Sequence, residues 1–134
     1  MQKSVSLTFI LLLFLSHKTF ANPKIGIDTT IYDFGKIKEG TEATHIFEIT
    51  NKGDSILNIL KVRSSCGCTA VLLTKKQIAP GEKAKLKVSY NTKGRLGKFK
   101  KRVYLYSNDP SSPKLILIIK GVVEPIKNQQ KTFD

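Results

Sequence analysis

Hydrophobic and polar residues alternate in short runs along most of the chain, and turn-forming residues separate the runs. In the clearest run, residues 83–90, every second residue is apolar: Ala84, Leu86, Val88 and Tyr90. Because successive side chains of a strand point to opposite faces, this run predicts a β-strand that is buried on one face only. The preceding Pro80-Gly81 pair is typical of a tight turn.

Other segments also have strand character, and together they predict about seven strands. The further segments are residues 31–34, 45–50, 57–62, 68–73, 99–106 and 115–123. The last of them is nearly all apolar, so we expect both of its faces to be covered. Strands at this short spacing, without helical periodicity, predict an all-β fold: a single antiparallel β-sandwich of the immunoglobulin type.

The N-terminal segment has the pattern of a secretory signal peptide. Lys3 precedes an apolar run at residues 5–15, and Ala21 ends a short polar stretch. The run is about half the length that spans a bilayer, so we expect cleavage after Ala21 rather than a permanent transmembrane span. Export to the periplasm or the extracellular space follows. Residues 22–123 would form the sandwich and residues 124–134 a polar tail.

The chain is short and strongly basic. Its 134 residues allow one domain, and 23 Lys and Arg against 10 Asp and Glu give a net charge of +13. Two interpretations stay open, since cations on strands serve solubility and edge protection, or form a cationic face for an acidic partner. An envelope protein, a lipid head group or an anionic glycan would suit such a face, whereas export argues against nucleic acid. The residues concerned are Lys83, Lys85, Lys87, Lys98, Lys100, Lys101 and Arg102.

Cys66 and Cys68 flank Gly67 and allow three interpretations. A disulfide requires the chain to bend at Gly67, and a strained bond of this kind would suit a redox role. An extended strand would instead point both thiols to one face, where they could bind Cu(I). The third interpretation is a pair of small, buried, unpaired residues that begin a strand. Zinc is not expected, because the exported chain would hold a single histidine, His45.

Catalytic machinery is not evident in the sequence. His45 has no nucleophile and orienting acid that can be assigned to it, and no Gly-rich phosphate loop occurs. No cofactor is expected. We therefore expect a non-catalytic binding or scaffolding module that acts through a sandwich edge or the cationic face. Thiol chemistry at the cysteine pair is the alternative, although reactive thiols usually lie at helix N-termini.

Five short motifs in order resemble those of a known family. They are Asp33-Phe34-Gly35-Lys36-Ile37, residues 47–53, Ser65-Cys66-Gly67-Cys68-Thr69, residues 78–82 and Ser107-Asn108-Asp109-Pro110. Over residues 33 to about 123 the chain resembles domain of unknown function 1573 (DUF1573). The resemblance implies an exported bacterial protein with an immunoglobulin-like fold similar to the ASH and major sperm protein domains. It implies no activity, although Cys66 and Cys68 match the family's Cys-Gly-Cys motif.

The resemblance also suggests a modification. Such proteins are frequent in Bacteroidetes-like bacteria, where Asp-Ser/Thr-apolar or Asp-Thr-Thr sequences can receive O-glycans. Asp28-Thr29-Thr30 and Asp54-Ser55-Ile56 fit this pattern. Thr29 and Ser55 are therefore candidate glycosylation sites.

Overall fold

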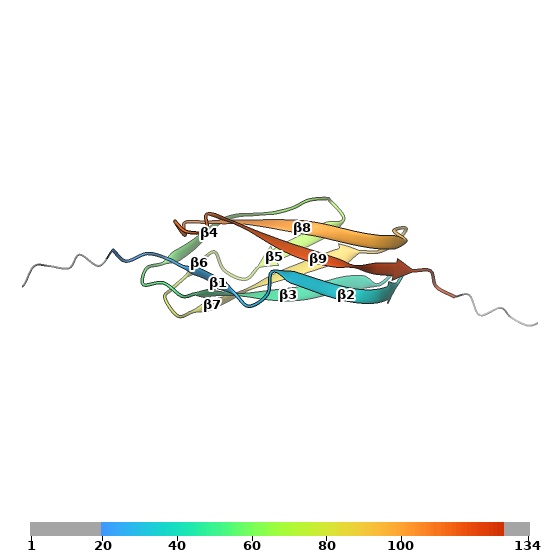
Figure 1. Ribbon diagram of the computed structural model, residues 1–134, viewed down its shortest axis with the longest axis horizontal. Coiled ribbons are helices and arrows are strands. Elements are labelled where there is room, and N and C mark those ends of the chain that lie inside the picture. The colour runs from blue at the N-terminus through green and yellow to red at the C-terminus, as the bar shows by residue number, and fades with distance from the viewer. Residues whose placement is uncertain (1–19, 128–134) are drawn as a thin grey trace, which may run out of the picture.

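The computed structural model describes residues 20–127, which form a sandwich of two β-sheets (Figure 1). The first sheet has the order β1-β3-β7-β5, and the second has the order β2-β9-β8-β4-β6. The strands are β1 (Ile25–Ile27), β2 (Ile31–Lys38), β3 (Glu42–Asn51), β4 (Leu57–Ser64), β5 (Thr69–Leu73), β6 (Gln77–Ile78), β7 (Lys83–Asn91), β8 (Gly97–Ser107) and β9 (Lys114–Glu124).

Two predicted segments, the signal peptide and the polar tail, lie at the ends of the chain. Most of the predicted signal peptide, residues 1–19, lies outside the described residues, as do residues 128–134 of the predicted tail. Within the described part, no helix is long and apolar enough to cross a membrane. Figure 1 shows that the chain enters at one end of the long axis, beside β1, and leaves at the other end, after β9.

The predicted all-β sandwich is confirmed, but three details of the prediction were wrong. Residues 20–127 form nine strands rather than about seven, because β1 and β6 have only three and two residues and are too short to show alternation. The sandwich is not wholly antiparallel, since β2 pairs with β9 in parallel. Third, we expected both faces of β9 to be covered, whereas its Ile116 is 42% exposed. Residue alternation reveals neither the direction of a strand nor its neighbours.

The core lies between the sheets and follows from the alternation in each long strand. Residues pointing inward from both sheets are almost fully buried, whereas their neighbours in sequence face solvent. The largest are Phe47, Ile49, Leu86 and Val88 from the first sheet and Leu57, Ile78, Val103, Leu105, Leu117 and Ile119 from the second.

Polar side chains fix the turns at one end of the sandwich. The buried amide of Asn51 donates to the carbonyls of Ser55 and Ile78, each at 2.8 Å. Its Oδ1 accepts from the N–H of Gly53 at 2.9 Å. A Cβ at Gly53 would collide with the backbone of Asn22, so only glycine fits there. These contacts bind the β3–β4 turn to β6 and to the residues before β1.

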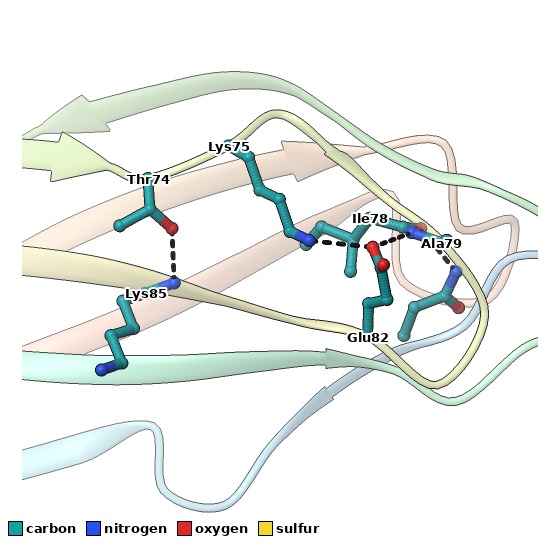
Figure 2. Close-up of polar contacts among 7 residues, drawn as sticks. Thr74, Lys75, Ile78, Ala79, Glu82 and Lys85 are labelled. Carbon is teal, nitrogen blue, oxygen red and sulfur yellow. Dashed lines mark hydrogen bonds and ion pairs between the residues drawn. The ribbon is translucent and has the colours of Figure 1, made fainter.

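The connection from β5 through β6 to β7 is held in place by its own polar contacts (Figure 2). Thr74 and Lys85 exchange two hydrogen bonds, since the Thr74 N–H donates to the Lys85 carbonyl at 3.0 Å and the Lys85 N–H to Thr74 Oγ1 at 2.9 Å. Glu82 accepts from Lys75 Nζ at 2.8 Å and from the N–H of Ala79 at 3.2 Å. The connection is therefore an ordered part of the surface.

Candidate functional site

The cysteine pair forms a disulfide in the turn between β4 and β5. The Cα atoms of Cys66 and Cys68 are 5.3 Å apart, and both residues are half-buried. The turn is attached to β8, because the Ser65 N–H donates to the Arg102 carbonyl at 2.8 Å and the Arg102 N–H donates to Ser65 Oγ at 3.1 Å. Ser64 Oγ donates to the Cys66 carbonyl at 2.9 Å.

This geometry decides between the structural interpretations of the pair. The interpretation as two buried, unpaired cysteines is wrong, because the two sulfur atoms are bonded and both residues are partly exposed. The extended strand required for Cu(I) is not adopted either, since Cys66 and Cys68 lie in a turn before β5 begins at Thr69. Gly67 does not have a positive φ, so the bend does not depend on glycine. A role in thiol exchange stays a prediction.

The predicted cationic face is divided between opposite sides of the sandwich. Lys83, Lys85 and Lys87 alternate with buried residues of β7 and therefore point outward from the first sheet. Lys98, Lys100 and Arg102 point outward from the second sheet, on β8. Lys101 is on the opposite side of β8 from these three, and its Nζ lies 5.8 Å from the centre of the Tyr90 ring. The expectation of a single face was wrong, because alternation does not show to which sheet a strand belongs.

The two cationic sets differ in their surroundings. On the first sheet, Lys83 forms an ion pair of 2.7 Å with Glu48 of β3. This contact lowers the pKa of Glu48 and raises that of Lys83, through the hydrogen bond first and the charge second. On the second sheet, neighbouring strands add further cations to the same side as β8.

We call this surface of the second sheet the β8 face. Strand register places its cations side by side, as in the Lys100–Lys120 pair of β8 and β9. Two carboxylates share the face, Asp33 and Glu124, and each lies near one lysine. The cations of the β8 face are Lys36, Lys38, Lys61, Arg63, Lys98, Lys100, Arg102, Lys114 and Lys120.

Two hollows lie on the β8 face. One, of about 470 Å³, opens beside the register shift in β2 and is lined by Asp33, Lys36, Lys98, Lys100 and Lys120, with Phe99 among its walls. The other, of about 390 Å³, lies near the disulfide turn. There Lys114 Nζ sits 4.9 Å from the centre of the Tyr104 ring and 5.7 Å from that of Tyr106. Arg63, Ser64 and Ser65 also line this second hollow.

His45 occupies the edge of the core. Its ring stacks on Tyr32 of the opposite sheet with the ring centres 3.7 Å apart, and it contacts Phe47 edge to face at 4.6 Å. Burial lowers the pKa of His45 from its ordinary value. These contacts give His45 a packing role.

Both candidate glycosylation sites lie in connections between strands. Thr29 is exposed between β1 and β2, and its Oγ1 donates to the Ile31 carbonyl at 2.8 Å. Ser55 is half-buried in the β3–β4 turn. Its carbonyl is held by Asn51. Modification at either residue stays a prediction.

The residue pattern did not reveal an apolar groove between β4 and β5. The groove has a volume of about 350 Å³, and Lys61 and Lys76 lie on its rim. Leu60 and Leu72 beside it are 64% and 66% exposed. Leu72 occupies one of the alternate positions that point outward in residues 68–73. Because its neighbours Val71 and Leu73 are also apolar, alternation in the sequence did not distinguish this exposed position. The apolar lining residues are Ile59, Leu60, Val62, Val71, Leu72 and Leu73.

Comparison with known families accounts for most of the chain. Residues 25–123 match the family described as "Protein of unknown function (DUF1573)". The chain belongs to this family. No curated protein matches the DUF1573 chain by sequence.

Solved structures support the fold of this DUF1573 protein. A Porphyromonas gingivalis protein of unknown function superposes with a TM-score of 0.69 at 18% identity, over 75% of this chain and 46% of that one. This chain thus spans about half of that protein's length. The ASH/PapD-like domain 7 of human CEP192 has a TM-score of 0.63 at 10% identity, over 79% and 89% of the two chains. The Vibrio cholerae VesB protease gives 0.62 at 16% identity, over 75% of this chain and 32% of the protease.

Proposed function

We propose that this DUF1573 protein is a non-catalytic binding module of the bacterial envelope, and that its β8 face binds an anionic glycan. The observation that carries the proposal is the excess of cations on four adjacent strands of one sheet, where Asp33 and Glu124 are the acids among them. A surface of one sign concentrates oppositely charged polymers near it. The two hollows add relief, and the Tyr104 and Tyr106 rings beside Lys114 add apolar surface for sugar rings.

The contacts of the two candidate reactive groups, His45 and the cysteine pair, support the non-catalytic character. The ring of His45 stacks on Tyr32 inside the sandwich edge. The sulfur atoms of Cys66 and Cys68 are bonded to each other. Both candidate reactive groups therefore already have partners within the protein.

Export is supported by the place where the sandwich begins. The carbonyl of Asn22 accepts a hydrogen bond from the Asp54 N–H at 3.0 Å, whereas Ala21 is exposed. Cleavage after Ala21 would therefore leave the fold complete. The intact mass of protein from the native envelope tests this, since a chain that begins at Asn22 supports export and an uncleaved chain contradicts the predicted cleavage. A bare mass would also exclude O-glycans on Thr29 and Ser55.

The glycan proposal is tested by charge reversal on opposite faces. The test protein carries Lys98→Glu, Lys100→Glu and Arg102→Glu, and the matched control carries Lys83→Glu, Lys85→Glu and Lys87→Glu. Both lose the same charge, but only the first set lies on the β8 face. Affinity for polygalacturonate, with neutral dextran as the uncharged polymer, is measured at low and high salt.

We expect the β8-face substitutions to weaken polygalacturonate binding at least about tenfold more than the control set does. Binding by the unsubstituted protein should also weaken steeply with salt, because exposed charges are screened. Equal losses in the two variants would show that net charge alone drives binding. That result, or binding to dextran as well as to polygalacturonate, would overturn the proposal.

Disulfide exchange is the second candidate, and the half-buried position of the Cys66–Cys68 bond at the surface favours it. Its test is the reduction potential in glutathione buffers. Exchange requires a potential near those of thiol–disulfide exchange proteins, about −120 to −270 mV, whereas a structural bond lies below about −300 mV.

A further inference from the structure

Strand β5 has a free edge, and the register with β7 determines which of its backbone groups lie on that edge. The Asn91 N–H donates to the Cys68 carbonyl, and the Thr74 N–H donates to the Lys85 carbonyl, both at 3.0 Å. In an antiparallel pair, alternate residues face the partner strand. Residues 68, 70, 72 and 74 therefore face β7, and the N–H and C=O groups of Val71 and Leu73 point away from it.

No other strand of the described residues pairs with β5 on that side. The opposite wall of the groove has the same character. The Ser65 N–H donates to the Arg102 carbonyl, so by the same alternation Arg63 faces β8 and the backbone of Val62 points outward. The short strand β6 pairs with β4 at Leu57 and Asn58, and just beyond this pairing the Ile59 N–H donates to the Lys76 carbonyl at 2.8 Å. The groove thus combines apolar side chains with unpaired backbone groups on both walls.

The contrast with β2 shows that this edge lacks the usual protection. The free edge of β2 carries Asp33, Lys36 and Lys38, and its register shifts after Asp33. Charges and bulges of this kind prevent another strand from pairing. The β5 sequence, Thr-Ala-Val-Leu-Leu, has no charge and no proline, and its fourth residue, Leu72, is 66% exposed.

We propose that the β5 edge binds an extended peptide segment of a partner protein, which adds to the first sheet as a further strand. The segment has apolar side chains at alternate positions, which enter the groove, and acidic residues near its ends. Pairing to the backbone of Val71 and Leu73 supplies affinity, and the groove supplies specificity. This surface shares only Lys61 with the β8 face, and the proposal does not depend on glycan binding.

Charge selects this occupant over a second copy of the chain. Lys61 and Lys76 lie on the rim of the groove, and Lys87 lies opposite Leu72 in the register. Pairing of two β5 edges would bring the cations of two copies of a +13 chain together, whereas an acidic segment neutralises them.

The ends of the groove set the length of the segment. The disulfide turn precedes β5 and the Thr74–Lys76 connection follows it, and the hydrogen bonds of Thr74 and Lys75 hold that connection in place (Figure 2). The five residues of β5 extend over about 17 Å, which matches a segment of about five residues.

A library of displayed seven-residue peptides, selected on the full chain, provides the test. We expect the selected peptides to alternate apolar with other residues and to carry Asp or Glu near the ends. Leu72→Lys should weaken their binding at least about tenfold, because it places a charge on the edge strand at an exposed position that lines the groove. Leu96→Lys is the matched control, since Leu96 is 58% exposed in the β7–β8 turn away from the groove. It should leave binding unchanged.

Val71→Pro provides the second variant. It removes an N–H that points away from β7, a position where an edge strand tolerates proline. Binding should be lost while the circular dichroism spectrum is retained. If the Val71→Pro variant unfolds, the result for Leu72→Lys alone tests the proposal, because residue 72 is exposed and its substitution should not disturb the core.

Three results would overturn the proposal. These are a library without enriched peptides, selected peptides that bind Leu72→Lys as well as the unsubstituted protein, and a homodimer in sedimentation that Leu72→Lys dissociates. The last would identify a second copy as the occupant. The β8-face variant should keep peptide affinity within about twofold, which separates this proposal from glycan binding.

Discussion

The carboxylate of Asp109, in the turn between β8 and β9, accepts a hydrogen bond from the backbone N–H of Ile25 in β1 at 2.9 Å, although 84 residues separate the two in sequence. The other oxygen of this carboxylate accepts from the N–H of Ser111 at 2.8 Å. Asp109 is 2% exposed. One side chain therefore shapes its own turn in the second sheet and attaches the first strand of the other sheet.

Replacement of Asp109 should loosen this attachment. We expect Asp109→Ala to lower the free energy of unfolding by about 2 kcal/mol, because backbone donors lose a charged acceptor. Urea denaturation measures the change. Asp54→Ala is the control, since its side chain is exposed in a turn, and it should change stability by less than about 0.5 kcal/mol. Equal effects of the two substitutions would contradict the structural role of Asp109.

From the burial of His45 we predict that the free energy of unfolding decreases in mild acid. Burial lowers its pKa in the folded protein, so the unfolded chain binds its proton more readily. The stability from neutral His45 is fully present above the unfolded pKa of about 6.5 and is lost as the pH falls from there through the lower folded value. His45→Phe keeps an aromatic ring against Tyr32 but cannot titrate.

The urea midpoint of each protein at pH 7 and at pH 5.5 measures this effect. The midpoint of the unsubstituted protein should fall between these pH values by more than that of His45→Phe. Parallel shifts in the two proteins would show that other groups cause the pH dependence.

The disulfide should contribute little to global stability. A bond between Cys66 and Cys68 closes a minimal loop, and the entropy that a cross-link removes from the unfolded chain grows with loop length. We expect Cys66→Ser combined with Cys68→Ser to lower the free energy of unfolding by less than about 2 kcal/mol. Thermal unfolding with and without reductant gives the same comparison for the unsubstituted protein, and collapse of the fold on reduction would refute this expectation.

Two glycines of the family motifs should respond differently to substitution. Gly81 has a φ of +79°, and its N–H donates to the Asn51 carbonyl at 2.9 Å. Gly81→Ala should therefore cost about 1 kcal/mol or more, since a side chain disfavours this backbone conformation. A Cβ at Gly67 meets no atom within 4 Å, and its φ is not positive, so Gly67→Ala should be nearly neutral. The reverse order of stabilities would exclude this explanation.

The features that the sequence predicted well are local ones. Alternation at residues 83–90 marks β7 because one strand needs only its own residues to show a buried face. The features it missed depend on which strands are neighbours. Lys85 and Lys100 occupy equivalent positions in their own strands, yet they face opposite sides of the sandwich. The edge position of β5 likewise follows from strand order, which alternation does not contain.

The family motifs also combine features that are visible in the sequence with features that depend on distant partners. The sequence indicates turns at Asn51 and Asp109. Asp109 lies in the β8–β9 turn, whereas Asn51 is the last residue of β3, just before the β3–β4 turn. Their second function, attachment of distant segments, depends on partners 27 and 84 residues away. Motifs of this kind maintain the fold, so membership in the family predicts architecture more directly than it predicts a ligand.

The positions of the two ends of the sandwich have a mechanical consequence. The chain enters beside β1 at one end of the long axis and leaves after β9 at the other (Figure 1). The eleven residues of β9 alone extend over about 36 Å. Domains fused before Asn22 and after Lys127 would be held apart at opposite poles, and tension between them would run along the strands. In a longer polypeptide, the module would act as a rigid spacer that adds its full length to the reach of its neighbours.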